Sequence, residues 1–279
     1  MHASLINKNQ CEKTGELKCS ICSLVTNSNC KIDPRMDDKN KSLHKFLHSS
    51  ILTSCILSAI LGVSQTALGG YQPPKDQKPP SGYSDSSGVR GSCSATTPIL
   101  LAPITHVGLT TSTHPTFVWF VLDNQSVPIQ FSLYEFDTNL KPKKLNSYTQ
   151  IFSSSSGLIQ RSLSNDLPGL SVGKRYLWQL QSLCNPNRPS HNPIARAEIE
   201  VVPVPQTLFN DLATTKDRFS KADLYGKYGM WYDAIKEVLP STSQEELSQV
   251  FISLLASLAQ SEKPVERKNL TDIAFIDGR

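Results

Sequence analysis

The stretch that most constrains the fold is residues 170–184, LSVGKRYLWQLQSLC. From Tyr176 onward its side chains alternate with a period of two, and Trp178 falls on the same face as Tyr176. This period is typical of a β-strand. Turn-forming residues precede it at 171–173 and follow it at 185–187. A single strand cannot bury both of its faces, so the flanking residues must supply an opposing sheet.

Leu170 precedes Tyr176 by six residues, which is the spacing of a tyrosine corner. In Ig-like and fibronectin type III sandwiches, the phenol of this tyrosine hydrogen-bonds the backbone a few residues upstream. Six further strand-like runs occur at the short spacing of an all-β domain: residues 99–104, 116–122, 129–136, 148–152, 158–163 and 194–202. With Trp119 early and Tyr176 late, residues 93–203 are predicted to form an all-β, Ig-like/fibronectin-III-like sandwich.

Beyond residues 203–205, Pro-Val-Pro, the apolar period becomes helical. Residues 220–239 predict two helices with a tight turn at Gly229, and Trp231 lies where the tetratricopeptide consensus has an aromatic residue. Tetratricopeptide arrays need about three units, and the chain has one. The hairpin must therefore pack on something else.

A second helical pattern covers residues 245–258, with a capping box formed by Ser243 and Glu246. Its apolar stripe would pack on the hairpin or bind a partner. Residues 204–261 are thus predicted to form a small C-terminal α-helical bundle, one tetratricopeptide-like hairpin plus one amphipathic helix. Residues 262–279 are predicted to be a polar tail.

Residues 36–69 have the three parts of a secretory signal peptide: a basic start, an apolar run at 51–63, and Ala67 and Gly69 before a cleavage site. The expected location is the periplasm or the extracellular cell envelope. An uncleaved signal anchor is the alternative and would be the protein's membrane contact, although the run is shorter than the roughly 20 residues of a span. A second alternative is lipidation at Cys55.

The remaining amino-terminal residues carry no assigned role. Residues 1–35 are a polar extension, read either as an over-extended start or as a long signal-peptide n-region. Four cysteines there include one close pair, Cys19 and Cys22. A zinc ribbon needs two such pairs, so no metal ligand is assigned. Residues 70–92 are rich in Pro, Gly and Ser and are predicted to be a disordered linker.

Cys93 and Cys184 are the cysteines that remain after the predicted signal peptide. An exported compartment permits oxidation, so we predict a disulfide between them. Two free thiols are the alternative.

The folded part carries no recognised catalytic motif. It has no nucleophile elbow, phosphate-binding loop, dinucleotide fingerprint or HExxH helix. His106, His114 and His191 are isolated and are expected to be loop or edge residues. No catalytic, cofactor-binding or metal residue is predicted, and no cofactor. The near balance of basic and acidic residues after residue 69 argues against a nucleic-acid partner.

Four blocks resemble a known family: VRGSC (89–93), GLTTSTHPTF (108–117), GKRYLWQLQSLCNP (173–186) and LYGKYGMWYDAI (224–235). They are similar to the mostly cyanobacterial exported family catalogued as Domain of Unknown Function 928. The resemblance covers roughly residues 89–240. It implies a β-sandwich followed by helices, an exported location and no established activity. It provides no functional residues to transfer.

Three functions remain open. The first is a non-enzymatic protein-interaction or assembly module of the envelope, with an unknown envelope protein as partner. The second is a carbohydrate-binding module, which would need exposed Trp or Tyr side chains. The third is an enzyme with no recognisable motif. Trp119, Tyr176, Trp178, Gly229 and Trp231 are predicted to be structural.

Overall fold

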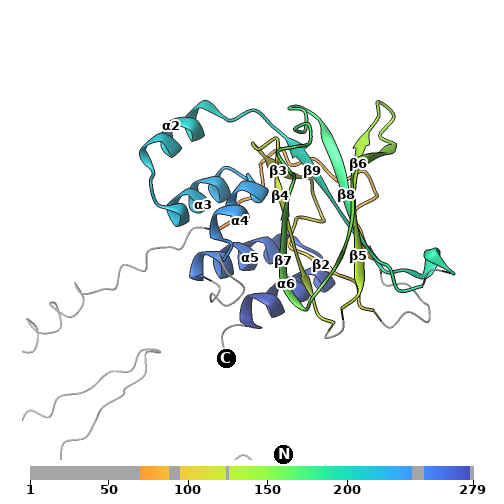
Figure 1. Ribbon diagram of the computed structural model, residues 1–279. Coiled ribbons are helices and arrows are strands. Elements are labelled where there is room, and N and C mark those ends of the chain that lie inside the picture. Colours follow the sequence, from red (N-terminus) through yellow and green to blue (C-terminus); the bar gives the residue numbers. More distant parts are fainter. Residues whose placement is uncertain (1–69, 88–94, 124–125, 186, 241–247, 277–279) are drawn as a thin grey trace, which may run out of the picture. The chain divides into compact units, whose positions relative to one another are not determined.

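The computed structural model describes residues 70–87, 95–123, 126–185, 187–240 and 248–276. Within these residues two β-sheets come first along the chain and helices follow (Figure 1). One sheet has six strands, in the order β1-β9-β8-β5-β6 with β3 parallel beside β9. Its members are β1 (Asp85–Ser87), β3 (Gly108–Thr110), β5 (Pro128–Phe136), β6 (Pro142–Ser153), β8 (Arg175–Ser182) and β9 (Ile194–Val201).

The second sheet has three antiparallel strands in the order β2-β4-β7. These are β2 (Ile99–Leu100), β4 (Thr116–Val121) and β7 (Gly157–Ser162). The two sheets pack against each other through aromatic side chains. The ring of Phe117 on β4 lies 5.1 Å from that of Phe131 on β5 and 5.0 Å from that of Trp178 on β8, between centroids.

Each predicted strand is present, with changed ends. The largest change is at residues 99–104, where β2 keeps only Ile99 and Leu100. The N–H of Leu101 still donates to Val118 O, but the next residue that would face β4 is Pro103, which has no N–H to continue the ladder. The N–H groups of Ile104 and Thr105 donate to the carboxylate of Glu262. β1 and β3 were not predicted, since each has only three residues and neither shows an apolar alternation.

The tyrosine-corner hydrogen bond is present. The Tyr176 hydroxyl accepts a hydrogen bond from the backbone N–H of Ser171 at 3.0 Å, and the phenol is buried. Gly173, in the turn between them, has a φ of 80°, a left-handed conformation that glycine adopts at little cost. This turn therefore directs the chain into β8.

The helices are α2 (Gln206–Thr214), α3 (Arg218–Lys227), α4 (Trp231–Val238), α5 (Gln249–Ser261) and α6 (Pro264–Ile276). The predicted turn at Gly229 is confirmed: it separates α3 from α4 with a φ of 77°. A Cβ at this position would lie 2.8 Å from a side-chain carbon of Pro74. Ser248 caps α5 by accepting a hydrogen bond from the N–H of Phe251, whereas the predicted capping box lies outside the described residues. α2 was not predicted.

Helices and sheets share one hydrophobic core. α4 contacts β3 and β4, and its Trp231 and Tyr232 are fully buried. The Tyr232 hydroxyl accepts a hydrogen bond from the indole N–H of Trp178 at 2.8 Å. α4 thus joins the helical part to both sheets.

Residues 70–87 are not the disordered linker that their composition predicts. We call residues 70–87 the N-terminal strap. Its second residue, Tyr71, is buried, and the Tyr71 N–H donates to Ser257 Oγ at 2.7 Å. The N–H of Gln72 donates to the carbonyl of Gly226 at 3.0 Å, and the strap ends as β1, paired with β9. Polar contacts and one aromatic anchor order a segment that is poor in apolar residues. The rest of the predicted linker lies outside the described residues.

Residues 264–276 are a helix, so the predicted polar tail is also corrected. Leu270, Ile273 and Ala274 of α6 are buried in the common core. Their spacing of three and one puts them on one face of the helix, and that contact with the rest of the core stabilises it. Among the described helices, none has the length and hydropathy of a membrane span.

Candidate binding cavity

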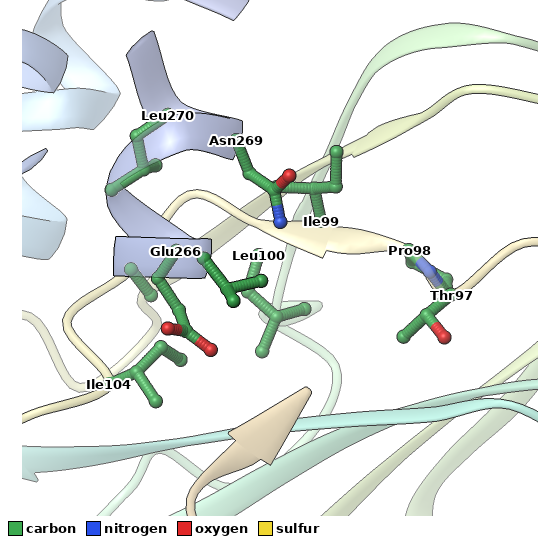
Figure 2. A pocket seen from close by; sticks show the side chains of 10 residues that line it. Thr97, Pro98, Ile99, Leu100, Ile104, Glu266, Asn269 and Leu270 are labelled. Atoms are coloured by element: carbon green, nitrogen blue, oxygen red, sulfur yellow. The ribbon is translucent and has the colours of Figure 1, made fainter. Parts of the chain in front are cut away.

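A cavity of about 190 Å³ lies between β2 and α6 (Figure 2). Most of its wall is apolar, with a small polar part contributed mainly by α6. The lining residues are Thr97, Pro98, Ile99, Leu100, Ala102, Ile104, Val265, Glu266, Asn269 and Leu270.

The strand side of the cavity is the edge of a sheet. β2 is the last strand in the order β2-β4-β7. Successive side chains of a strand point to opposite faces, yet both Ile99 and Leu100 line the cavity. The cavity therefore runs along the edge of β2 and not over one face of the sheet.

The helix side is held in place by α5. The Arg267 guanidinium donates to the carbonyl oxygens of Ala259 at 3.1 Å and Glu262 at 3.1 Å, at the carboxyl end of α5. The Ala259 carbonyl also accepts from the N–H of Glu262 at 3.3 Å, so the guanidinium adds a second donor to the end of the helix. The Arg267 bonds also fix the direction in which α6 leaves α5, and hence the position of Val265 at the cavity.

Glu262, between α5 and α6, connects the junction of these two helices to the chain that follows β2. Its buried carboxylate accepts hydrogen bonds from the N–H groups of Ile104 at 3.0 Å and Thr105 at 3.1 Å. Burial raises the pKa of Glu262, and the two backbone N–H groups oppose that rise. The chain after β2 is therefore tied to the residue that precedes α6.

The polar groups of the cavity are few. Among the described residues that line it, Glu266 is the titratable one, and the other polar side chains are those of Thr97 and Asn269. Nucleophilic catalysis pairs a nucleophile with a base within hydrogen-bond reach, and the described lining shows no such pair. An apolar recess with a few polar groups at its mouth is typical of a binding site.

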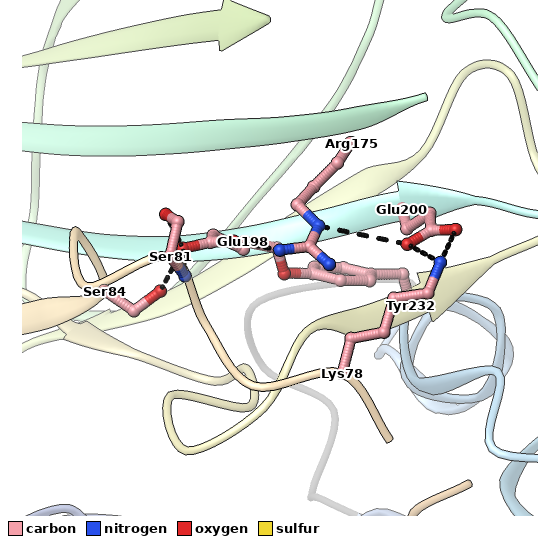
Figure 3. Close-up of polar contacts among 7 residues, drawn as sticks. All are labelled: Lys78, Ser81, Ser84, Arg175, Glu198, Glu200 and Tyr232. Atoms are coloured by element: carbon pink, nitrogen blue, oxygen red, sulfur yellow. Dashed lines mark hydrogen bonds and ion pairs between the residues drawn. The ribbon is translucent and has the colours of Figure 1, made fainter. Parts of the chain in front are cut away.

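A charged cluster lies elsewhere, where the N-terminal strap crosses β8 and β9 (Figure 3). Glu198, fully buried, accepts from the N–H of Ser81 at 2.8 Å, and its other carboxylate oxygen lies 3.5 Å from Arg175 Nη1. Glu200 is paired with Lys78 of the strap. Each carboxylate has a cation beside it, as buried charges require. The cluster therefore attaches the strap to the sheet.

His106 lies in a loop, as predicted, but it is buried and not at an edge. Its Nε2 is 2.8 Å from the Tyr71 hydroxyl, and the two rings stack with centroids 5.8 Å apart. Burial lowers the pKa of His106 to about 4. His106 thus serves as a neutral partner for the strap's aromatic anchor.

The residues predicted to be structural lie in the core and line no part of the cavity. Trp119, Trp178 and Trp231 are fully buried. A buried indole cannot offer its face to a sugar ring, so the tryptophans give no support to carbohydrate binding. Of the tyrosines in residues 220–239, Tyr232 is fully buried and Tyr225 and Tyr228 are half-buried.

The predicted disulfide stays a prediction, because Cys93 lies outside the described residues. Cys184 follows β8, and its backbone N–H donates to Asn192 Oδ1 at 3.3 Å. The predicted signal peptide and the extension before it, residues 1–69, also lie outside them. In the described ranges, no three His, Cys, Asp or Glu side chains gather as a metal-binding group.

Sequence reasoning did not identify the cavity residues. The sequence predicts a strand at residues 99–104 and a polar tail at residues 262–279, and the two are far apart along the chain. One signal was available: Leu270, Ile273 and Ala274 follow the proline at position 264 with helical spacing.

Comparison with known proteins yields one family. A search of curated proteins finds no match. The family model matches residues 85–264, from the start of β1 to the first residue of α6. The α6 wall of the cavity lies just beyond this match. The four sequence blocks, the two sheets with their following helices and this match over most of the chain agree, and the chain belongs to the family described as Domain of Unknown Function (DUF928).

Proposed function

We propose that this protein is an exported, non-enzymatic binding module of the cell envelope. The observation that carries the proposal is the cavity beside β2, which combines apolar walls with one carboxylate and one amide at α6. Export is supported by the signal-peptide pattern at residues 36–69. The resemblance to a mostly cyanobacterial exported family also favours it.

The finer fold assignment is part of this proposal. The bond between Tyr176 and Ser171 and the face-to-face packing of the two sheets support an Ig-like or fibronectin type III relationship. The parallel pairing of β3 with β9 would then be an addition to that plan. The glycine turn at Gly229 and the aromatic residue at Trp231 support a tetratricopeptide-like hairpin.

The cavity favours a protein-interaction role over the alternatives. A carbohydrate-binding module would stack sugars on exposed aromatic side chains, and the tryptophans are buried. An enzyme would bring reactive groups together, and the part of the cavity lining that the structure describes has one titratable residue.

The test is recovery of envelope proteins by the mature chain. Val265 lines the cavity and its side chain is 65% exposed, so Val265→Glu should fold and place a charge at the mouth. We expect this variant to lose the bound partner. Val172→Glu is the matched control, because Val172 is 54% exposed and lies in the turn before β8, away from the cavity. Equal recovery by Val265→Glu and the unaltered chain would refute the proposal.

A further inference from the structure

We infer that one end of the six-stranded sheet docks onto the surface of an anionic lipid bilayer, with Leu140 and Val172 entering the bilayer and lysines contacting its headgroups. This surface consists of the tip of the β5–β6 hairpin with the first residues of β6, residues 137–144, and the turn before β8, residues 171–174. We call it the lysine-rimmed end. It is separate from the cavity beside β2, so the inference goes beyond the proposed function.

The backbone of the hairpin tip provides the first argument. The N–H of Leu140 donates to the carbonyl of Asp137, and the N–H of Asp137 donates to the carbonyl of Lys141, both at 3.0 Å. Leu140 has a φ of 56°, and among the residues that the structure describes it is the only one besides glycines with a positive φ. Hairpins with such a turn usually have glycine at this position, because a side chain makes the left-handed conformation unfavourable.

Packing within the fold does not offset this strain. The Leu140 side chain is 53% exposed, so its contacts with the rest of the protein stabilise the tip only weakly. The turn is held instead by the Asp137 carboxylate, which accepts hydrogen bonds from the N–H groups of Asn139 at 2.8 Å and Lys141 at 2.9 Å. A strained residue that contributes little to the stability of the fold points to a function at the surface.

A second exposed aliphatic side chain lies at the same end of the sheet (Figure 1). β5 and β8 are antiparallel, with Glu135 opposite Tyr176, so the turn before β8 lies at the end of the sheet where β5 enters the hairpin. Val172 in that turn is 54% exposed. Lys174 of the same turn is 3.3 Å from the Glu135 carboxylate. Two neighbouring loops therefore present aliphatic side chains to solvent.

The charge of this end is positive. Lys141, Lys143 and Lys144 are exposed, and none of them forms an ion pair with another residue that the structure describes. The nearby carboxylates have partners of their own, Glu135 in its ion pair and Asp137 in the hydrogen bonds of the tip. Each lysine close to an anionic membrane raises the affinity for it about fivefold.

A bilayer fits this combination better than a protein partner does. Protein interfaces are depleted in lysine and are apolar at their centre, whereas here Lys141 directly follows Leu140. At a bilayer, single aliphatic side chains enter the boundary between headgroups and acyl chains, and lysines extend toward the headgroups. Lysines on an edge strand can also serve only to prevent the addition of further strands, but that role does not require an exposed leucine at the tip.

The probe is a pair of vesicle preparations, phosphatidylcholine alone and phosphatidylcholine mixed with phosphatidylglycerol, sedimented with the mature chain. We expect binding to the anionic vesicles that salt weakens, and much weaker binding to the neutral ones. Leu140→Gly should reduce the affinity at least about fivefold. Its melting temperature should be unchanged or higher, because glycine suits a φ of 56°.

Leu122→Gly is the matched control for the leucine. Leu122 is 52% exposed and follows β4, in the connection to the start of β5 and so at the other end of that strand. This variant should bind anionic vesicles like the unaltered chain. Equal losses of vesicle binding in the two leucine variants would overturn the assignment of Leu140.

The lysines are tested separately. Lys143→Gln combined with Lys144→Gln should reduce the affinity for anionic vesicles roughly fivefold for each lysine. Lys227→Gln combined with Lys236→Gln, at exposed positions of α3 and α4, changes the net charge equally and should have little effect. Equal losses in these two double variants would mean that net charge alone drives binding, which overturns the inference.

The remaining outcomes separate the inference from the proposed function. Val265→Glu should bind vesicles normally although it loses its envelope partner, and Val172→Glu should bind vesicles more weakly although it keeps that partner. If the mature chain binds neither preparation, or both equally, the inference is wrong and the proposed function is unaffected. If Val265→Glu keeps its envelope partner while Leu140→Gly loses vesicle binding, the proposed function is wrong and the inference holds.

Discussion

The indole N–H of Trp231 donates a hydrogen bond to the carbonyl oxygen of Leu101 at 2.9 Å. Trp231 begins α4, and Leu101 directly follows β2, the strand that borders the cavity. The ring of Tyr71 packs edge-on against Trp231 with centroids 5.0 Å apart. The N-terminal strap, the three-stranded sheet and the helices therefore meet at one tryptophan.

Replacing Trp231 should mainly affect stability. Trp231→Ala removes a fully buried aromatic side chain and should lower the free energy of unfolding by about 3–5 kcal/mol. Trp231→Phe keeps a ring but leaves the Leu101 carbonyl without its donor, at a cost of about 1–3 kcal/mol. Denaturant unfolding measures both. Phe209→Ala on α2, where the side chain is 60% exposed, is the control and should change stability by less than about 0.5 kcal/mol.

A partner role for Trp231 gives a different result. Thermal stability would then be nearly unchanged in Trp231→Ala, and recovery of the envelope partner would be lost. Unchanged stability together with unchanged recovery would contradict both roles.

Tyr71 should be as important as a core residue of the sheets. Tyr71→Ala removes the ring that contacts Trp231 and His106 and should cost about 3–5 kcal/mol. Tyr71→Phe removes only the hydroxyl bonded to His106 and should cost about 1 kcal/mol. Tyr83→Ala, in the same strap but 38% exposed, is the comparison. Equal melting temperatures for Tyr71→Ala and Tyr83→Ala would show that the strap is not anchored by Tyr71.

The parts of the fold that follow local patterns could be predicted. The alternation from Tyr176 and the turn before it are encoded within a few residues, and so is the glycine turn at Gly229. The ordered structure of the N-terminal strap could not be predicted, because it comes from contacts with residues that are far away in the sequence. Tyr71 bonds Ser257, 186 residues away, and composition alone indicates disorder.

The candidate site was outside the reach of sequence reasoning for a related reason. The cavity arises because β2 ends after Leu100 and because α6 returns beside it. Pro103, inside the predicted strand, has no N–H to continue pairing with β4, and this signal was present in the sequence. The contacts of Ile104 and Thr105 with Glu262, about 158 residues away, could not be predicted from it. By contrast, the helical pattern around Leu270 was present in the sequence and was read as a tail.

Stability should fall as the pH is lowered from about 6.5 to about 4. Burial lowers the pKa of His106 from 6.5 to about 4, so within this window the unfolded chain binds a proton that the folded chain does not. The loss is at most about 3 kcal/mol. Unfolding free energies at pH 7 and pH 4.5 should differ less in His106→Gln than in the unaltered chain.

Two other buried groups have the opposite effect on the pH dependence of stability. Burial raises the pKa of Asp233 and of Glu262, so their stabilising contribution is complete below their ordinary pKa and decreases as the pH rises through the raised values. Both proteins contain Asp233 and Glu262, so comparing the unaltered chain with His106→Gln isolates the contribution of His106 to the pH dependence. An identical pH dependence in both proteins would mean that His106 titrates normally in the folded chain.

The mature protein should contain no free thiol. A disulfide between Cys93 and Cys184 would close a long loop and contribute on the order of 4–5 kcal/mol in the chain-entropy model. Thiol counting on the unfolded, unreduced mature protein measures this directly. Two reactive thiols would rule the bond out, and Cys93→Ser should then leave the stability unchanged.

The amino terminus of the exported protein should lie near Gly70. The small residues Ala67 and Gly69 fit a signal-peptidase site, and Tyr71 is the first buried residue that the structure describes. A cut after Gly69 keeps this anchor, whereas a cut beyond Tyr71 would remove it and its contacts with Ser257 and His106. Amino-terminal sequencing of the protein from the envelope fraction measures the cut. An intact Met1 on a cytoplasmic protein would contradict export, and a start beyond Tyr71 would contradict the strap's anchoring role.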